Sequence, residues 1–247
     1  MSSPYAQQGF RVRFDWGPAG AGEIGGDARF VTVIDVLSFT TALTVAVERG
    51  IDVYPYRWRD ESAVEYARTR DALLAMGRSE ADGPGRVSLS PATILRAQGI
   101  RRIVLPSPNG STIAQGLAAR GATVVGVSLR NARAAARWVA NALGPNDVVA
   151  VIASGERWKP DGSLRPALED LWGAGAFLKS LELPGSPEAE AAIAAWDRFG
   201  GRPPLADCAS GRELIAYGYP EDVEVAAEVG ASEAVPVLTG EAFTAAA

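Results

Sequence analysis

The stretch RFVTVIDVL, residues 29–37, is an apolar and β-branched run that only Asp35 interrupts near its end. Such a run is typical of a strand that is buried on both faces of a parallel sheet. Residues 39–49 follow with apolar side chains at helical spacing, and Gly50 ends that pattern. A buried strand followed at once by a helix predicts a β-α unit that places Asp35 at the end of its strand.

The same alternation repeats along the chain. We expect further strands at 51–56, 103–105, 123–127 and 148–153, and further helices at 60–76, 112–120, 132–143 and 166–183. Short connections between alternating strands and helices are typical of a parallel sheet covered by helices. The sequence therefore predicts an α/β fold, with three α/β/α layers around a mixed, mostly parallel sheet. Residues 1–247 are expected to form a single domain, with two similar lobes meeting near residues 95–105 as the open alternative.

Three segments depart from this regular pattern. Residues 10–16 alternate and lead into a glycine-rich stretch at 17–26, which predicts a hairpin or an edge strand. Residues 78–91 are rich in turn-forming residues and predict an ordered loop or lid. In the C-terminal third we expect helices near 187–199, 208–217 and 221–229, followed by a short strand at 234–238.

Composition excludes several kinds of chemistry. The chain has no histidine and only one cysteine, Cys208, so Ser-His-Asp catalysis, zinc clusters and intrachain disulfides are excluded. The formal charge of −5 argues against non-specific nucleic-acid binding. The sequence offers no uninterrupted apolar run of membrane-spanning length, and residues 1–9 lack the pattern of a secretory signal. We therefore expect a cytoplasmic location, without membrane or nucleic-acid partners.

Four polar loops follow predicted strands, at the position where open α/β sheets bind ligands. They are residues 35–41, 107–112, 128–131 and 154–157. Since the carboxyl ends of parallel strands meet at one edge of a sheet, we expect these loops to lie close together.

Asp35 is the most informative of these polar residues, because a carboxylate at the end of an apolar strand needs a cation or strong donors. Glu169 and Asp170 form an acidic pair at the start of a predicted helix. Without histidine, oxygen atoms remain as ligands, and hard divalent ions prefer them. We therefore expect Mg²⁺ at Asp35, Glu169 and Asp170, joined by Glu80. The open alternatives are structural: a loop cap for Asp35, helix-dipole complementation for the acidic pair, and a solvated loop side chain for Glu80.

The loop at 107–112 is a candidate anion site, because Gly110 permits a close backbone approach and the next helix begins there. The turn is expected to be a surface loop. The alternative is a capped helix start without a ligand, and the same ambiguity applies to Thr40 and Thr41. The candidate substrate-binding residues are Thr40, Thr41, Ser107, Asn109, Gly110, Ser111, Arg130 and Asn131. Catalytic parts are expected for Asp35, Asn109 and Arg130, with Arg130 adding positive charge.

Four segments in this order resemble the 2-phosphosulfolactate phosphatases, Mg²⁺-dependent enzymes associated with coenzyme M biosynthesis in archaea and widespread in bacteria. They are VIDVLSFTTAL at 33–43, SPNGSTIA at 107–114, GVSLRNARA at 126–134, and ASGERW with LEDLWGAG at 153–158 and 168–175. The resemblance extends over about residues 10–240. It implies an α/β fold peculiar to the family and hydrolysis of an acidic, three-carbon phosphomonoester such as 2-phosphosulfolactate, giving sulfolactate and phosphate.

Two of the departures of this chain from the family pattern bear on its function. The family segment that matches 35–41 usually carries arginine where this chain has Ser38, and the family's Gly-Glu turn near 77–80 is interrupted here by Arg78 and Ser79. These differences motivate two alternatives: a non-catalytic protein that binds a small anion, and a phosphatase for another anionic metabolite. The expected partner is a small phosphorylated acid that also carries a sulfonate in the case of 2-phosphosulfolactate. A homodimer is left open, as is the nucleophile, with water favoured over Asp35 itself.

Overall fold

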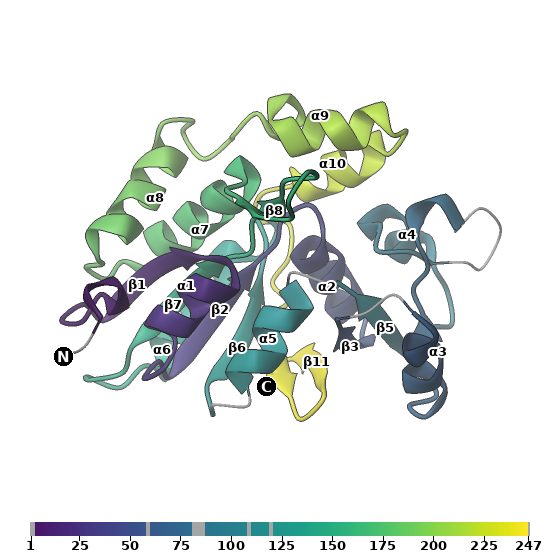
Figure 1. Ribbon diagram of the computed structural model, residues 1–247, viewed down its shortest axis with the longest axis horizontal. Helices are drawn as coiled ribbons and strands as arrows, with labels where there is room; N and C mark the ends of the chain where they lie inside the picture. Colours follow the sequence, from purple (N-terminus) through teal and green to yellow (C-terminus); the bar gives the residue numbers. More distant parts are fainter. Residues whose placement is uncertain (1–2, 58–59, 81–86, 108–109, 119–120, 247) are drawn as a thin grey trace.

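The computed structural model describes residues 3–57, 60–80, 87–107, 110–118 and 121–246. A nine-stranded sheet, in the order β1-β7-β2-β6-β10-β11-β3-β5-β4, runs through the molecule (Figure 1). Its strands are β1 Val12–Trp16, β2 Phe30–Ile34, β3 Asp52–Tyr56, β4 Leu73–Leu74, β5 Arg102–Pro106, β6 Thr123–Val127, β7 Val149–Ala153, β10 Pro236–Thr239 and β11 Ala242–Ala245. The helices are α1 Gly17–Ile24, α2 Phe39–Glu48, α3 Glu61–Arg68, α4 Pro91–Arg96, α5 Gly110–Ala118, α6 Ala132–Ala142, α7 Leu168–Leu181, α8 Pro187–Asp197, α9 Ala209–Ala216 and α10 Pro220–Ala226. The predicted α/β fold with a mixed, mostly parallel sheet is confirmed.

The sheet consists of two parallel halves that a C-terminal hairpin joins. Strands β1, β7, β2 and β6 are parallel neighbours, and so are β3, β5 and β4. Between them lie β10 and β11, which pair antiparallel with each other and with the flanking strands. Val237 lies opposite Val125 on one side of the hairpin, and Phe243 lies opposite Val53 on the other. Residues 236–245 therefore make one sheet out of two.

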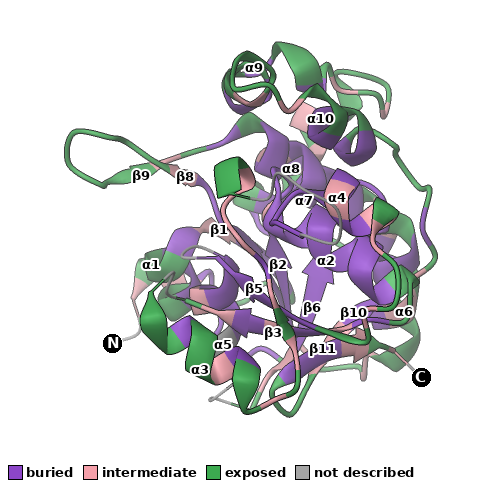
Figure 2. Ribbon diagram, turned by 90° about the vertical axis from the view of Figure 1, so that its right-hand side faces the viewer, coloured by how far each residue is buried: buried purple, intermediate pink, exposed green. Residues whose placement is uncertain are grey.

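Helices cover both faces of this sheet, which confirms the three-layer prediction. In β2, Phe30 and Ile34 pack into the core formed with α6, α7 and α8, whereas Val31 and Val33 pack into the core formed with α1, α2 and α5. Both sets are buried, as are all residues of the neighbouring strand β7 (Figure 2). The continuous apolar run of RFVTVIDVL therefore reflects burial on both sides, which stabilises the fold by about 1.5–3 kcal/mol for each large side chain.

Strand β1 lies at the edge of the sheet, which confirms the edge-strand alternative for residues 10–16. The glycine-rich residues after it do not return as a hairpin but form helix α1, because Pro18 lies in its first turn and the helix packs on β1 and β7. Another local prediction was wrong. The helix expected over 60–76 ends at Arg68, and the backbone at Asp71 has a φ of +50°. The chain then continues as the edge strand β4, which pairs with β5.

The polar loops lie where the fold brings strand ends together. Strands β2, β6 and β7 are parallel neighbours, so the loops that follow them share one edge of the sheet. Helices α9 and α10 lie above this edge, and the hairpin of β8 Glu156–Arg157 and β9 Leu164–Arg165 extends away from it (Figures 1 and 2). Among the described helices, none has the length and apolar character needed to cross a membrane.

Candidate active site

Asp35 lies at the point where the loops after β2 and β5 meet. Its Oδ1 accepts a hydrogen bond from the N–H of Phe39 at 3.3 Å, at the start of α2. The N–H of Gly110, at the start of α5, also donates to this carboxylate. The Thr40 hydroxyl holds the backbone of Asp35, accepting its N–H at 3.0 Å and donating to its carbonyl oxygen at 2.8 Å. Two helix N-termini therefore face one carboxylate at the strand end.

Asp170, in the first turn of α7, joins the ends of two strands. Its Oδ1 accepts the N–H of Val36 at 2.7 Å, and its Oδ2 accepts the N–H of Gly155 at 2.8 Å. The side chain is buried, and burial raises the pKa of this carboxyl well above its usual value, with further increases from the charges of Asp35 and Glu169. Both oxygens of Asp170 thus hold backbone that flanks Asp35.

Acidic groups are crowded around Asp35. Burial raises the pKa of Asp35 to about 6, and the charge of Glu169 contributes in the same direction, while the charge of Arg78 opposes it. Burial, followed by the charges of Asp35 and Glu169, raises the pKa of Glu156 to about 7. The buried Cys208 thiol donates to Glu169 Oε2 at 3.5 Å. The site thus holds carboxyl groups that exchange protons near neutral pH.

A cavity of about 790 Å³ opens beside these carboxyl groups. The strand-end loops supply Leu37, Pro106 and Glu156, and the opposite wall comes from Tyr217 and Tyr219 next to α9 and α10. Its described lining residues are Leu37, Asp60, Ala63, Leu74, Ala75, Met76, Gly77, Arg78, Ser79, Glu80, Leu89, Pro106, Glu156, Ser210, Glu213, Leu214, Tyr217 and Tyr219. The volume is that of a small-molecule site.

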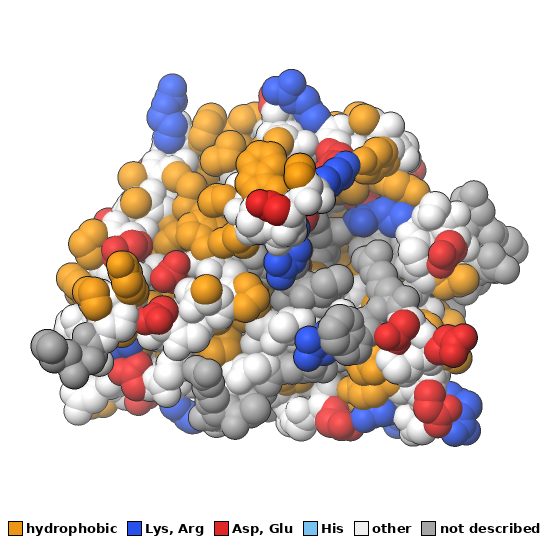
Figure 3. Space-filling model, viewed as in Figure 1, with side chains coloured by type: hydrophobic (Ala, Val, Ile, Leu, Met, Phe, Trp, Pro, Cys, Tyr) orange, Lys and Arg blue, Asp and Glu red, His pale blue; other side chains and the backbone are white. Residues whose placement is uncertain are grey.

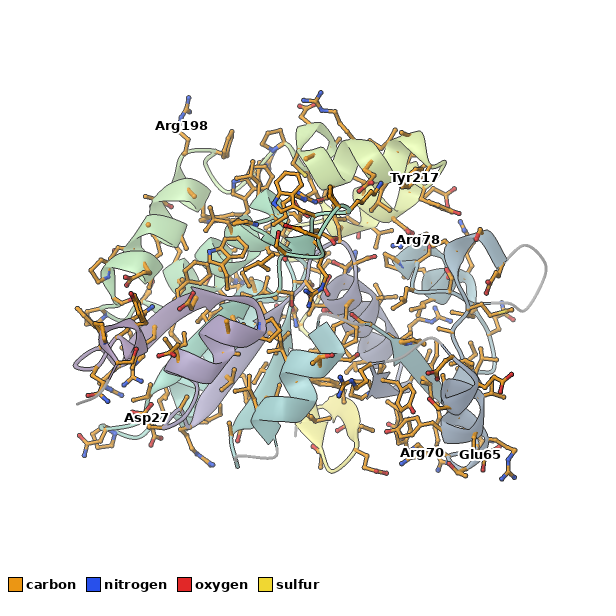
Figure 4. The ribbon with its side chains drawn as sticks, in the orientation of Figure 1. Asp27, Glu65, Arg70, Arg78, Arg198 and Tyr217 are labelled. Carbon is orange, nitrogen blue, oxygen red and sulfur yellow. The ribbon has the colours of Figure 1, made fainter. Side chains whose placement is uncertain are left out.

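Arg78 enters this cavity from a 3₁₀ turn, Arg78–Glu80, below α9 and α10 (Figure 4). Its Nε donates to Asp222 Oδ2 at 2.8 Å, and its Nη2 donates to the hydroxyl of Ser38. The guanidinium also lies 5.7 Å from the ring centre of Tyr219. A cation therefore lies at Ser38, the position at which the sequence lacks the expected arginine.

Comparison with known proteins identifies the family of this chain. A sequence model of 2-phosphosulpholactate phosphatase matches residues 23–241, which include every loop around Asp35. The chain belongs to the 2-phosphosulfolactate phosphatase family. It is 34% identical over 218 residues to a Thermus thermophilus protein named "Probable 2-phosphosulfolactate phosphatase", covering 85% of this chain and 88% of that protein. A Deinococcus radiodurans protein of the same name is 32% identical over 215 residues, covering 83% of this chain and 86% of its own.

Carboxylate oxygens are the metal donors that this member of the 2-phosphosulfolactate phosphatase family offers. Asp35 and Glu169 interact electrostatically, and Glu156 interacts with both. Within the described residues, however, no three His, Cys, Asp or Glu side chains are grouped as a ready-made metal site. Magnesium in proteins usually binds to one or two carboxylates and completes its shell with water and substrate phosphate. The donor set therefore fits Mg²⁺ that is shared with a bound substrate.

Several predicted binding residues have structural partners instead of facing the cavity. Thr41 Oγ1 donates to the Val36 carbonyl oxygen at 2.7 Å, and Ser111 Oγ donates to the Leu105 carbonyl oxygen at 3.4 Å. Both hydroxyls therefore brace the loops that carry Asp35 and Gly110.

Asn131 and Ser107 are also buried. Asn131 Oδ1 accepts the N–H of Ser128 at 2.8 Å, and its Nδ2 donates to the carbonyl oxygens of Gly126 and Ala234 at 3.2 and 3.0 Å. Its amide thereby closes the loop after β6 and ties it to the segment before β10. The N–H of Ser107 donates to the carbonyl oxygen of Tyr56 at 2.8 Å and so extends the pairing of β3 with β5.

Arg130 lies apart from Asp35. Its Nη1 donates to Glu228 and to the Val225 carbonyl oxygen, and its Nη2 lies 3.4 Å from Glu48 Oε2. Arg130 is buried and absent from the described cavity lining. Its role in the structure is therefore to form ion pairs where α2, α6 and α10 meet.

Glu80 and the Asn109-Gly110 turn complete the predicted set. Glu80 lines the cavity, where its Oε2 accepts the N–H of Gly77 at 3.3 Å. Asn109 lies outside the described residues. Gly110 is buried instead of lying in a surface loop, because it packs against Phe39: a Cβ at Gly110 would lie 2.4 Å from Phe39 Cδ1.

Three residues of the site were not among the sequence candidates. Glu156 lies in one of the four polar loops, so the strand-end rule could have selected it. Arg78 and Asp222 carry no local signal, because their ion pair joins segments far apart in the chain. Only the fold brings these two side chains to the same cavity.

Proposed function

We propose that this chain hydrolyses a small acidic phosphomonoester such as 2-phosphosulfolactate, with Mg²⁺, and releases sulfolactate and phosphate. Family membership supports the reaction class. The observation that carries the proposal is the surrounding of Asp35, where the N–H groups of Phe39 and Gly110 meet carboxyl groups at the edge of a small-molecule cavity. Helix N-termini favour anionic groups such as phosphate, and oxygen ligands favour Mg²⁺.

Charge explains why this reaction needs a cation. Asp35, Glu156, Glu169 and Asp170 interact with one another electrostatically, and a phosphomonoester would add further negative charge. Mg²⁺, held by Asp35 and Glu169, would neutralise the transferring phosphoryl group. Asp170 uses both oxygens on backbone N–H groups, so we assign it the positioning of Asp35.

The proton transfers follow from the pKa values. A water molecule attacks phosphorus, the ester P–O bond breaks, and the alcohol leaves with one proton. Burial raises the pKa of Asp35 to about 6 in the metal-free protein, so Asp35 is ionised at neutral pH and would accept a proton from the attacking water. Glu156, which lines the cavity and whose pKa burial raises to about 7, is partly protonated and supplies the proton to the leaving alkoxide. The protein itself thereby provides a base and an acid.

Phosphate release from a panel of monoesters tests this proposal. The panel contains 2-phosphosulfolactate, 2-phospholactate and 3-phosphoglycerate, each measured with Mg²⁺ and with EDTA. We expect turnover of 2-phosphosulfolactate that depends on Mg²⁺, and a loss of at least about 100-fold in Asp35→Asn. Glu65→Gln, an exposed ion-paired residue on α3, is the matched control and should retain activity.

The panel also separates the alternatives. Saturable binding without phosphate release would instead support a non-catalytic small-anion-binding protein. Turnover of the other esters but not of 2-phosphosulfolactate would support a phosphatase for a different metabolite. Turnover that EDTA leaves unchanged would contradict the part assigned to Mg²⁺.

A further inference from the structure

We propose that Arg78 binds a second acidic group of the substrate, a carboxylate or a sulfonate, and thereby selects phosphomonoesters that carry one. This inference deepens the proposed function and rests on it for the position of the phosphate. Arg78 is the one cationic side chain among the described residues that line the cavity, whereas Asp60, Glu80, Glu156 and Glu213 are acidic. Among the described lining residues, a second anion therefore has the charge of Arg78 to bind.

The ion pair of Arg78 is oriented toward the cavity. The side chain of Asp222 is 2% exposed, whereas that of Arg78 is 20% exposed. The pair between Arg130 and Glu228 has the opposite orientation, with 5% exposure for the arginine and 53% for the acid. Among the ion pairs of the described residues, the Arg78 pair is the one whose acid is buried. The buried acid therefore anchors a guanidinium that remains accessible from the cavity.

The remaining hydrogen-bond donors of Arg78 favour an anionic ligand. Nε is used by Asp222 and one Nη2 hydrogen by Ser38, while Nη1 makes no hydrogen bond within the described residues. The second Nη2 hydrogen and the Nη1 group form the planar edge that binds carboxylate-like oxygens in pairs. Asp222 is itself held by the hydroxyl of Ser90, so the guanidinium is fixed before a ligand arrives.

This subsite adjoins the phosphate position. The phosphate is assigned to the helix N-termini at Phe39 and Gly110, beside Asp35. Arg78 contacts Ser38, the residue before Phe39, and lies near Tyr219. A small acid whose second anionic group is close to its phosphate can therefore place one group at each position. In the space-filling view, acidic and basic side chains are interspersed over the region of α3 and α4 (Figure 3).

Binding measurements test the proposal without relying on turnover. The probes are sulfolactate, which has a carboxylate and a sulfonate but no phosphate, and inorganic phosphate, both measured by calorimetry with Mg²⁺ present. The main variant is the double substitution Arg78→Gln with Asp222→Asn, which removes both charges and leaves no buried carboxylate unpaired. We expect the affinity for sulfolactate to fall about 10- to 100-fold and that for phosphate to change less than about threefold.

Two further variants keep the test decisive. Arg78→Lys retains a charge opposite Asp222 but loses the planar edge, and we expect a selective loss of about 10-fold for sulfolactate. If the double variant does not fold, Arg78→Lys alone tests the proposal. Arg96→Gln is the matched control. Arg96 pairs with Glu221, which precedes Asp222 on helix α10, and both side chains of this pair are exposed. It should leave both affinities unchanged.

Other results would overturn the inference. These are equal losses for both probes, unchanged affinity for sulfolactate in the variants, or an absence of saturable sulfolactate binding by the unaltered protein at millimolar concentration. Sulfolactate binding that depends on Arg78, in a protein that releases phosphate from no ester, would contradict the proposed function and support the subsite. The two proposals therefore fail separately.

Discussion

Asp170 Oδ1 accepts the N–H of Val36 at 2.7 Å, so a buried acid of helix α7 fixes the residue next to Asp35. The second oxygen holds Gly155, at the end of β7. One side chain therefore sets the separation of two strand ends at the site, which is the positional precision that catalysis requires.

We expect Asp170→Asn to damage both stability and activity. An asparagine presents one acceptor oxygen where two N–H groups need acceptors, so one buried donor loses its partner. The free energy of unfolding should fall by about 1–3 kcal/mol, measured by urea denaturation. Phosphate release should fall about 10-fold or more, because Asp35 is displaced. Asp161→Asn, which alters an exposed carboxylate that accepts a backbone N–H from Ser163, is the control and should retain activity. Full activity in Asp170→Asn would refute the role of Asp170 in positioning Asp35.

The pKa values predict a pH dependence of stability in the metal-free protein. Burial raises the pKa of Asp35 to about 6 and that of Glu156 to about 7, whereas unfolded carboxyls titrate near pH 4. The folded state therefore binds more protons than the unfolded state between about pH 4 and 7, and its stability falls as the pH rises through this window. The contribution of Asp35 is at most about 3 kcal/mol.

Thermal melts in EDTA at pH 5 and pH 8 measure this effect. Relative to the double variant Asp35→Asn with Glu156→Gln, the unaltered protein should lose more stability at pH 8 than at pH 5. Adding Mg²⁺ should raise the Tm more at pH 8, where the carboxylates are ionised. Parallel melting curves for the two proteins across this range would contradict the assigned pKa values.

Gly110 and Gly116 lie on the same helix and should respond in opposite directions to alanine. At Gly110 the new methyl group meets the Phe39 ring, so we expect Gly110→Ala to lose about 1–3 kcal/mol. At the exposed Gly116 a Cβ has open space, and alanine should stabilise the helix by about 0.5–1 kcal/mol. Adding Phe39→Leu to Gly110→Ala should recover part of the loss. An unchanged Tm in Gly110→Ala would show that Phe39 does not require the glycine.

Arg130 offers a test of structural against substrate-binding roles. Its ion pairs with Glu228 and Glu48 predict that Arg130→Gln lowers the free energy of unfolding by about 2 kcal/mol while KM changes less than about threefold. The exposed neighbour Arg133, changed to glutamine, should alter stability by no more than about 0.5 kcal/mol. A large rise in KM for Arg130→Gln at unchanged Tm would instead support the original expectation of substrate binding.

Elements that depend on neighbouring residues could be predicted from the sequence, whereas elements that depend on contacts between distant segments could not. The strand at 29–37 and the helix after it were predictable because burial on two faces and helical spacing are written in consecutive residues. Residues 60–76 kept a helical spacing, but Leu73 and Leu74 pair with β5, which lies far along the chain. The glycine-rich segment 17–26 resembled a turn, and its helix depends on packing against β1 and β7.

The site divides in the same way. The structure brings Asp35, Glu169, Asp170 and Gly110 together, as expected from the rule that ligands bind at strand ends. Arg78 and Asp222 form an ion pair between segments that are far apart in the chain. The residues next to each of them in the sequence give no sign of this pairing. Arg130 was selected because it follows a strand, but its buried position depends on Glu48 at the end of α2 and on Glu228 beyond α10.

The hairpin of β10 and β11 has a consequence for how the molecule is assembled during synthesis. Each parallel half can form its own local units as the chain emerges, but the sheet is not continuous until residues 236–245 have been made. The hairpin pairs with β3 and β6, which are made much earlier, and strand pairings between distant parts of a chain form slowly during folding. The loops around Asp35 come from both halves and the cavity wall includes Tyr217 and Tyr219, so the nascent protein completes its cavity only in the last stage of synthesis.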